Sequence, residues 1–310
     1  MTSPFNQHLD RNEANFAALT PLSHIERSAA IYPDRLAIVH GELRQTWAQT
    51  YARCRQLAHA LQKAGIGKND TVAVILPNTP PMVEAHFGIP MAGAVLNTLN
   101  TRLDPEAIAF MLDHGEAKAL IVDPEFTSLV AKALKLRERT EPLLVIQTED
   151  ELYGPAAVQV GSITYEDFLA QGDPDFAWQL PEDEWDAIGL NYTSGTTGNP
   201  KGALYSHRST VLHGLKIALS MGASLPEGAK VLPVVPLFHV NAWGLPYAAP
   251  MVGLSMVMPG PALDGPSLFK LMDGEGVFSA WGVPTVWLGL LAEIKAQGRI
   301  PDGFGELVVG

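Results

Sequence analysis

The sequence predicts an α/β protein in which helices cover mainly parallel sheets. Short apolar runs typical of buried strands alternate with longer segments of helical periodicity along most of the chain. This alternation favours parallel strands that are joined through helices. The chain has 310 residues, of which 47% are hydrophobic and 17% are charged, so it can bury a large core. We therefore expect two closely packed α/β lobes.

The first elements follow from periodicity and from the position of proline. A helix is expected over residues 21–32, because Pro21 suits the first helical position. Residues 36–39 form a strand-like apolar run. Over residues 47–64, apolar side chains recur at spacings of four and three, which predicts one face of a helix. Cys54 lies on that face, so we expect it to pack in the core rather than to react.

Strands and helices then alternate as far as residue 146, and a change of composition follows. Residues 147–185 are richer in turn formers and in acidic residues. We place a boundary there, with a first α/β subdomain over residues 1–185 and a second over residues 186–310. The expected strands before the boundary are Val72–Leu76, Val95–Leu99, Ala119–Val122 and Leu143–Ile146, and the expected helices span residues 82–87, 105–113 and 126–137.

The second subdomain continues the alternation. Ser206 is expected to cap a helix that runs to about residue 221 and contains His207 and His213. The nine histidines are scattered without the spacing of zinc ligands, so no zinc site is expected. The other expected elements are the strands 187–190, 231–235 and 306–309 and the segments 263–272, 277–280 and 284–294.

The charge and cysteine content restrict the class of protein. A formal net charge of −12 disfavours nucleic acid or an anionic membrane as the main partner, since both require a basic surface. A single cysteine cannot form an internal disulfide, which suits a reducing compartment. No targeting signal and no segment of membrane-spanning length is visible. The expected location is the cytoplasm.

The most informative stretch is the eleven residues from Tyr192 to Gly202, which follow the apolar run 187–190. They combine hydroxyl side chains, glycines and one lysine, Lys201. Small residues allow backbone N–H groups to approach phosphate oxygens, hydroxyls add neutral donors or a metal ligand, and lysine compensates charge. A Gly/Ser/Thr cluster can also be an ordinary loop, but the lysine at a fixed offset favours a polyphosphate site.

The stretch differs from the Walker A loop, G-x-x-x-x-G-K-[ST]. Pro200 precedes Lys201 and Gly202 follows it, whereas a Walker lysine and its hydroxyl neighbour open a helix. Proline disfavours a helical conformation for Asn199, and glycine is a poor helix former. We therefore expect Lys201 on a mobile loop rather than on a helix.

Residues 192–202 resemble the phosphate-loop signature of the adenylate-forming superfamily, which includes acyl-CoA synthetases, firefly luciferase and adenylation domains of peptide synthetases. A second similarity lies in Pro236-Leu237-Phe238-His239-Val240-Asn241-Ala242-Trp243-Gly244, and a third in Gly282-Val283-Pro284-Thr285-Val286-Trp287. The second resembles most closely the fatty-acyl-CoA synthetase branch of this AMP-binding superfamily. The similarity covers essentially the whole chain from about residue 20.

The resemblance implies the fold and the extent of the chain. It implies the N-terminal domain of an adenylate-forming enzyme, with mainly parallel sheets in a layered αβαβα arrangement. In the family, a strand similar to residues 306–309 leads into the adenine-binding turn, a ribose-binding aspartate and a small C-terminal domain with a catalytic lysine. These parts are absent, so we expect a chain truncated before the C-terminal domain and inactive alone.

The resemblance also implies a reaction. A carboxylic acid attacks the α-phosphate of ATP to give acyl-adenylate and pyrophosphate, and coenzyme A then displaces AMP. Lys201 and His239 are the implied catalytic residues, and Thr193 is an implied Mg²⁺ ligand through its hydroxyl. The implied ATP-binding residues are Thr193, Ser194, Gly195, Thr196, Thr197, Gly198, Lys201, Val240 and Trp243.

The implied acyl-binding residues are His239, Trp243, Pro284 and Thr285. Without its flanking motif, His239 would be read as a satisfied core histidine, and Trp243 as a core tryptophan. The apolar surroundings of His239 favour a medium- or long-chain fatty acid or another hydrophobic acid. A short or sulfur-containing acid is an alternative, and so is a non-catalytic binding or dimerisation module. Long-chain relatives dimerise through N-terminal segments, so a homodimer is implied.

Overall fold

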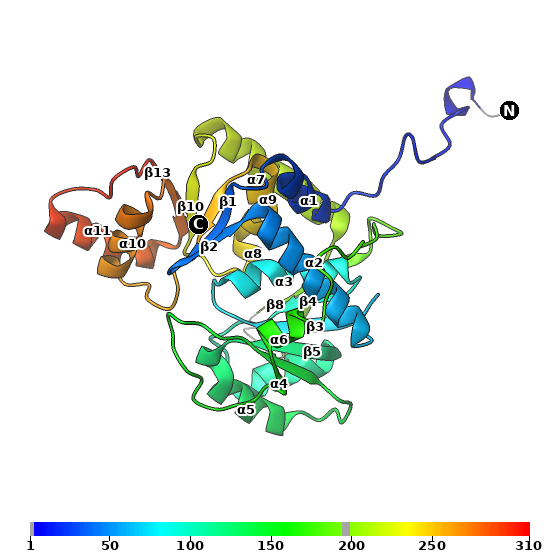
Figure 1. Ribbon diagram of the computed structural model, residues 1–310, viewed down its shortest axis with the longest axis horizontal. Coiled ribbons are helices and arrows are strands. Elements are labelled where there is room, and N and C mark those ends of the chain that lie inside the picture. Colours follow the sequence, from blue (N-terminus) through cyan, green and yellow to red (C-terminus); the bar gives the residue numbers. More distant parts are fainter. Residues whose placement is uncertain (1–2, 194–198) are drawn as a thin grey trace.

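The strands of the protein form two mainly parallel sheets, which we call sheet A and sheet B. The computed structural model describes residues 3–193 and 199–310. Sheet A has the strand order β13-β12-β10-β11-β1-β2 and sheet B the order β7-β6-β5-β3-β4-β8-β9 (Figure 1). Among the described strands, only the pairs β1/β2 and β8/β9 are antiparallel. Sheet A contains β1 (Leu36–His40), β2 (Leu43–Thr46), β10 (Lys230–Pro233), β11 (Ser255–Val257), β12 (Ser279–Gly282) and β13 (Glu306–Val309), and sheet B contains β3 (Thr71–Ile75), β4 (Val95–Thr98), β5 (Ala117–Val122), β6 (Leu144–Gln147), β7 (Ile163–Thr164), β8 (Ala187–Thr193) and β9 (Lys201–Ser206).

Helices cover both faces of each sheet and give the expected αβαβα layering. Three hydrophobic clusters separate the layers: one between the two sheets, one outside sheet B and one outside sheet A. In Figure 1, α10 and α11 lie at the left of the molecule and α4 and α5 at the bottom. The outer helices are α4 (Pro105–His114), α5 (Thr127–Leu136), α10 (Gly265–Glu275) and α11 (Pro284–Gln297), and the helices between the sheets include α1 (Leu22–Ile31), α2 (Trp47–Lys63), α3 (Pro80–Met91), α6 (Tyr165–Leu169), α7 (His207–Ser224) and α9 (Leu245–Val252).

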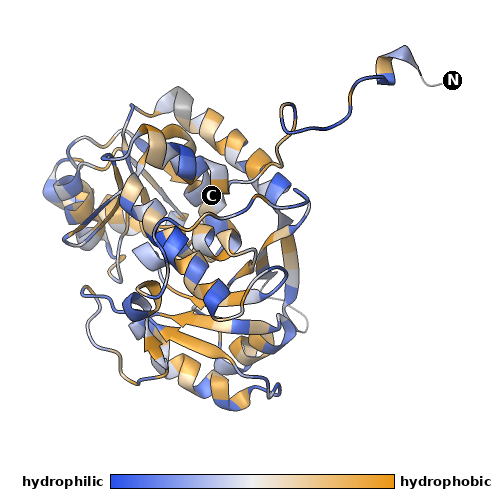
Figure 2. Cartoon of the chain, turned by 45° about the vertical axis from the view of Figure 1, so that its right-hand side comes forward, coloured by the Kyte–Doolittle hydropathy of each residue, from blue (hydrophilic) through white to orange (hydrophobic). Residues whose placement is uncertain are grey.

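Strand β3 illustrates why the sheets are parallel and buried. All five of its residues are buried, with Val72 and Val74 in the cluster between the sheets and Ala73 and Ile75 in the cluster outside sheet B. A strand that packs helices on both faces has apolar residues at every position rather than at alternate ones. In Figure 2 the strands of sheet B are accordingly hydrophobic, whereas the surrounding helices also carry hydrophilic residues.

Local signals fix several helix ends. The hydroxyl of Thr46 accepts from the backbone N–H of Gln49, and the side-chain oxygen of Gln49 accepts from the backbone N–H of Thr46. This capping box begins α2. Ser206 caps α7 in the same way through Ser209, as the sequence predicted. Cys54 on α2 is fully buried, and burial raises the pKa of its thiol. The prediction that Cys54 packs in the core is therefore confirmed.

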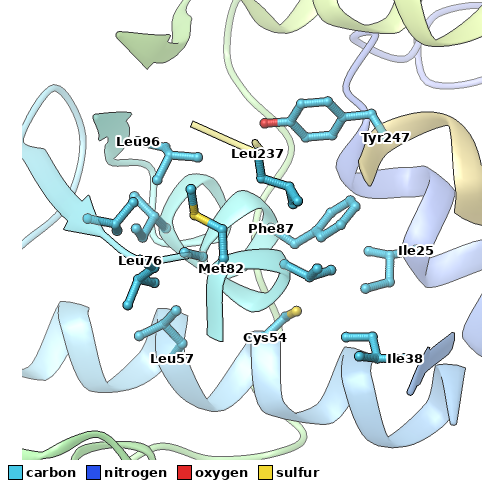
Figure 3. Packing of buried hydrophobic residues seen from close by; sticks show 14 of the residues in the cluster. Ile25, Ile38, Cys54, Leu57, Leu76, Met82, Phe87, Leu96, Leu237 and Tyr247 are labelled. Carbon is cyan, nitrogen blue, oxygen red and sulfur yellow. The ribbon is translucent and has the colours of Figure 1, made fainter. Parts of the chain in front are cut away.

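The core between the sheets is formed by residues from distant parts of the chain. Phe87 of α3 lies between Tyr247 of α9 and Cys54 of α2, with Ile25 of α1 in the same cluster (Figure 3). Leu237, from the segment that follows β10, is fully buried in the same cluster. The buried side chain of Leu237 therefore holds the segment after β10 in the core between the sheets.

The expectation of a loop at Lys201 is wrong. Lys201 is the first residue of β9, which pairs with β8 in the register Thr193↔Lys201. Proline is tolerated just before an edge strand, because the donor that it lacks is not needed there. The structure therefore places Lys201 opposite Thr193 rather than on a free loop.

Both sheets take strands from either side of residue 185. Strands β1 and β2 belong to sheet A together with β10 to β13, and β8 and β9 extend sheet B. The expected boundary at residues 185 and 186 therefore does not coincide with the boundary between the sheets. Residues 3–17 are exposed and extend away from this body, as Figure 1 shows. Among the described residues, no helix has both the length and the apolar character that crossing a membrane requires.

Candidate functional site

The candidate site is built first on the hairpin of β8 and β9. Thr193 ends β8, and its hydroxyl donates to the carbonyl oxygen of Lys201 at 3.4 Å. The Lys201 side chain is exposed and forms no ion pair with any residue of 3–193 or 199–310. Its positive charge is thus available to an anion. The other predicted phosphate-binding residues, Ser194, Gly195, Thr196, Thr197 and Gly198, lie outside the described residues.

The second part of the site is a left-handed turn, α8 (Val240–Trp243), which follows His239. The φ angles of Val240, Asn241, Ala242 and Trp243 are 47°, 49°, 46° and 56°. The left-handed conformation costs L-residues about 1–2 kcal/mol each, and the β-branched Val240 is especially unsuited to it. Such strain persists only where surrounding contacts enforce it, and it is concentrated at functional sites.

Asn78, which follows the carboxyl end of β3, fixes the segment before this turn. Its side-chain NH₂ group donates to the carbonyl oxygens of Pro233 and Val235 at 2.7 and 3.0 Å. Its side-chain oxygen accepts from the backbone N–H of Leu237 at 2.8 Å. Asn78 is buried, so these hydrogen bonds satisfy both halves of its amide. Sheet B thereby holds the chain as it leaves sheet A.

Thr98 and Asn191, on the adjacent strands β4 and β8, hold the turn itself. The Thr98 hydroxyl lies 3.0 Å from the side-chain oxygen of Asn191 and 3.2 Å from the carbonyl oxygen of Phe238. The side-chain NH₂ group of Asn191 donates to the side-chain oxygen of Asn241 at 2.8 Å. Residues 238 and 241 are therefore both attached to sheet B, on either side of His239.

The end of the turn is held from the other side. The imidazole Nε2 of His213, on α7, lies 2.9 Å from the carbonyl oxygen of Trp243. The Trp243 ring is partly buried and lies beside Trp281 of β12, with 6.2 Å between ring centroids and an interplanar angle of 34°. Trp243 is thus in contact with sheet A, while its neighbour Asn241 is bound to sheet B.

The predicted acyl-binding residues differ in their surroundings. His239 is exposed, so it is not a buried core histidine. Val240 is also exposed. Pro284 and Thr285 form the exposed start of α11, just after β12. The aromatic neighbour of Trp243 in this region is Trp281 of β12, the strand that precedes them.

A cavity of about 240 Å³ opens beside this segment, where the carboxyl ends of strands from both sheets meet. In parallel α/β sheets, ligands bind at this edge. Phe238 and Asn78 line the cavity, together with Arg102 and Glu125. Burial and the nearby Asp150 raise the pKa of the Glu125 carboxyl. Burial also raises the pKa of Asp123, at the end of β5, to about 7.

Tyr192 connects the hairpin to α4. Its hydroxyl lies 2.8 Å from Nδ1 of His114, and burial raises the pKa of the phenol to about 12. The tyrosine therefore keeps its proton and fixes the outer face of β8. Its neighbours on the strand, Asn191 and Thr193, point to the opposite face, since side chains alternate along a strand.

Sequence reasoning missed the residues that hold the site together. Asn78, Thr98, Asn191 and His213 act through partners that are distant in sequence, so no local pattern marks them. Asn241 could have indicated the left-handed turn, because asparagine tolerates a left-handed backbone better than most residues. This prediction was not drawn from the sequence. Within residues 3–193 and 199–310, no group of three or more His, Cys, Asp or Glu side chains could hold a metal ion.

Comparison with known proteins identifies the family. The model of the family described as AMP-binding enzyme matches residues 25–303, which include both parts of the site. The chain belongs to the AMP-binding enzyme family. The sequence-based identification of this superfamily is therefore confirmed.

Curated relatives of this AMP-binding chain are named as CoA ligases of different acids. An acetate–CoA ligase from Humulus lupulus is 48% identical over 76% of this chain and 43% of its own length. A medium-chain-fatty-acid–CoA ligase from Ectopseudomonas oleovorans is 43% identical over 86% of this chain and 48% of its own length. A long-chain-fatty-acid–CoA ligase from Thermus thermophilus is 43% identical over 92% of this chain and 51% of its own length. This AMP-binding chain spans about half the length of these relatives.

Solved structures share the fold. The anthranilate CoA ligase AuaEII in complex with anthranoyl-AMP superposes with a TM-score of 0.81 at 21% identity, over 96% of this chain and 56% of that chain. An inhibitor-bound N-terminal domain of FACL13 from Mycobacterium tuberculosis gives a TM-score of 0.76 at 22% identity, over 94% of this chain and 70% of that chain. The AMP-binding chain thus has the N-terminal fold of adenylate-forming enzymes, as predicted.

Proposed function

We propose that this AMP-binding chain carries the ATP-binding and acid-binding residues of an acid–thiol ligase. The enzyme would convert a carboxylic acid and ATP into acyl-adenylate and pyrophosphate, and then transfer the acyl group to the thiol of coenzyme A with release of AMP. One observation carries the proposal. The hairpin with Thr193 and Lys201 and the turn with His239 are joined by the 2.8 Å hydrogen bond between Asn191 and Asn241. A polyphosphate site and an apolar acid site would thereby lie side by side.

Lys201 would neutralise charge during the first step. The carboxylate oxygen of the acid attacks the α-phosphorus, and the bond to the β-phosphate oxygen breaks, so negative charge passes to the departing pyrophosphate. An exposed ammonium group at the end of the hairpin, without an ion-pair partner in the described part of the chain, suits this role. Ser194, Gly195, Thr196, Thr197 and Gly198 are proposed to hold the same phosphates through N–H and hydroxyl donors.

Thr193 fits a role at the magnesium ion that accompanies ATP. Its hydroxyl is a hard oxygen ligand of the kind that Mg²⁺ accepts, and the long 3.4 Å contact to Lys201 leaves it available. When bound with ATP, magnesium would neutralise negative charge on the phosphates. In such sites Mg²⁺ is held by substrate phosphates, waters and one or two carboxylates, so Thr193 would supply one ligand among several.

The turn would position the acid. His239 and Val240 are both exposed, so they can border the acid carboxylate and the nucleotide. Trp243, with Trp281 behind it, offers an apolar surface for the acyl chain, and Pro284 and Thr285 are proposed to line its continuation. Orientation of two reactants in this way accounts for much of the rate enhancement in such reactions.

For the substrate we propose a medium- or long-chain fatty acid or another hydrophobic acid. The residues on either side of His239 in the sequence, Phe238 and Val240, are apolar, and so is Trp243. A short acid is the second candidate, because the acetate–CoA ligase relative is 48% identical to this chain. A sulfur-containing acid is a third, since a 3-methylmercaptopropionyl-CoA ligase from Ruegeria pomeroyi is 43% identical over 267 residues.

We also propose a homodimer and a cytoplasmic location. Residues 3–17 extend from the body, and Phe5 and Leu9 on this arm are 87% and 70% exposed. Exposed apolar side chains on an extended arm are favourable for contact with a second copy. Light scattering at micromolar concentration tests the dimer, and a monomer mass would contradict it.

The reaction is tested by exchange of radioactive pyrophosphate into ATP, with acids from acetate to palmitate. The assay uses a form as long as the curated relatives, beside this 310-residue chain. A peak at one acid in the longer form supports adenylation and names the substrate class. We expect the 310-residue chain to bind ATP but to be silent in exchange. Absence of exchange with every acid in the longer form would favour a non-catalytic binding module instead.

A further inference from the structure

Asn191 lies between the two halves of the candidate site. It is on β8, two residues before Thr193, so both side chains are on the same face of sheet B. Only 9% of Asn191 is exposed. Its amide uses both ends: the oxygen accepts from the Thr98 hydroxyl, and the NH₂ group donates to Asn241.

Asn241 is the partner of Asn191 in the strained turn. Its backbone is left-handed, with φ 49° and ψ 48°, and it lies one residue after Val240 and two after His239. A shift of β8 is transmitted through the 2.8 Å side-chain bond to a turn that has few alternative conformations. Because the bond is largely shielded from water, breaking it leaves polar groups unsatisfied.

We propose that Asn191 and Asn241 are positioning residues that make ATP binding and acid binding mutually cooperative. Through their hydrogen bond, occupation of the site at Thr193 and Lys201 would fix the turn that carries His239 and Trp243, and occupation of the acid site would fix β8. This inference rests on the proposed function of the chain. Because coupling between two binding equilibria is reciprocal, each ligand raises the affinity for the other by the same factor.

The bonds of Asn78 separate this role from general support of the fold. They hold the segment before the turn without Asn241. Loss of the Asn241 side chain therefore leaves the segment attached to sheet B. What is lost is the direct link between the strand of Thr193 and the turn.

The experiment measures binding to the 310-residue chain by titration calorimetry. The probes are dodecanoate and the magnesium complex of α,β-methylene-ATP, in which the scissile oxygen is replaced so that no adenylate forms. The dissociation constant of dodecanoate is determined with and without saturating nucleotide analogue. Their ratio is the coupling factor, and for the wild-type chain we expect about fivefold or more.

The variants isolate the hydrogen bond from backbone strain. Asn241→Gly keeps a residue that accepts the left-handed conformation and removes the side-chain oxygen. Asn241→Asp keeps an acceptor for Asn191 and also tolerates this conformation. Asn69→Gly is the matched control, because Asn69 has a φ of 68° in an exposed turn elsewhere. Chemical denaturation of each variant confirms that it is folded.

We expect Asn241→Gly and Asn191→Ala to bring the coupling factor to within about twofold of one, and the double variant to lower it no further. Asn241→Asp and Asn69→Gly should keep the wild-type factor. A wild-type factor in folded Asn241→Gly would overturn the inference, as would independent binding of the two probes by the wild-type chain. If the wild-type chain bound neither probe, both the inference and the proposed binding role of this chain would fail.

Discussion

Gly244 lies directly against the imidazole of His213. A Cβ atom at Gly244 would be 2.5 Å from Cδ2 of His213, and the φ angle of Gly244 is 83°. The same histidine binds the carbonyl oxygen of Trp243. The left-handed turn therefore ends at a glycine that is needed both for its backbone conformation and for the approach of α7.

Gly244→Ala is expected to destabilise the protein more than alanine does at another left-handed glycine. Gly276 has a φ of 62° with no atom within 4 Å of its added Cβ, so Gly276→Ala measures backbone strain alone, about 1–2 kcal/mol. Gly244→Ala should cost about 1–3 kcal/mol more, because the His213 ring must move. Urea unfolding of both variants gives the comparison. Equal losses would mean that the contact with His213 is relaxed without cost.

Asn78→Ala should lower the free energy of unfolding by about 2–4 kcal/mol. The substitution removes three hydrogen bonds and leaves the carbonyl oxygens of Pro233 and Val235 without that donor in a buried place. Asn100→Ala is the control, since the side chain of Asn100 makes one exposed bond to the N–H of Arg102. A loss for Asn78→Ala no larger than for Asn100→Ala would show that sheet B does not hold this segment.

Lys201→Ala should reduce pyrophosphate exchange by about 10²-fold in a form that catalyses it, because one charge contact in the transition state is lost. The side chain is exposed, so the free energy of unfolding should change by less than about 0.5 kcal/mol. Lys216→Ala, at an exposed position of α7, is the matched control for charge. Exchange by Lys201→Ala at the wild-type rate would refute the role of Lys201.

Trp243→Ala should alter the dependence on acyl chain length more than it alters stability. The partly buried ring forms a surface with Trp281 along which an acyl chain can lie. We expect the ratio of kcat/KM between octanoate and palmitate to change by about tenfold or more. Trp185→Ala, at a tryptophan that is 70% exposed, should leave the ratio unchanged. An identical profile for Trp243→Ala and wild type would remove Trp243 from the acyl site.

His86→Leu should reduce the loss of stability in acid. His86 is fully buried, and burial lowers its pKa from 6.5 to about 4. The unfolded chain therefore takes up this proton below about pH 6.5, while the folded chain stays neutral down to about pH 4. The free energy of unfolding therefore decreases as the pH is lowered through this window. At pH 5 the contribution of His86 to this loss is about 2 kcal/mol.

Urea unfolding at pH 7.5 and pH 5 measures the His86 effect as the difference between the two values in each protein. His207, whose pKa is also lowered to about 4 by burial, contributes equally to wild type and variant. The exposed His8 provides a control substitution, His8→Leu. If His86→Leu lost as much stability between pH 7.5 and pH 5 as the wild type, the lowered pKa of His86 would not be the cause.

Local features of the fold were predictable because they depend on neighbours in sequence. The helix over residues 47–64 and the cap at Ser206 arise from side-chain spacing and from one hydroxyl. The assignment of strands to one sheet or the other depends instead on residues that are distant in sequence. The pairing of Ile38 with Met256 joins segments that no periodicity relates, so the layered arrangement was expected only from the family resemblance.

The site was predictable only as separate motifs. Residues 192–202 and the segment around His239 were recognised by resemblance, which identifies residues but not the contacts that hold them. The strained conformation of Val240 and Ala242 opposes their intrinsic preferences and exists because tertiary contacts enforce it. A prediction from local propensity therefore fails at this turn, which is where sequence and structure are expected to disagree at a functional site.

The interleaving of the two sheets has a consequence for how the chain folds as it is made. Strands β3 to β7 can pair soon after they leave the ribosome, because their partners are close in sequence. The hairpin of β1 and β2 must wait until β11 has been synthesised, more than 200 residues later. During that interval the apolar face of β1 is without its native partner, and such long-range pairing is slow. Sheet A is therefore expected to complete its strand pairing only late in synthesis.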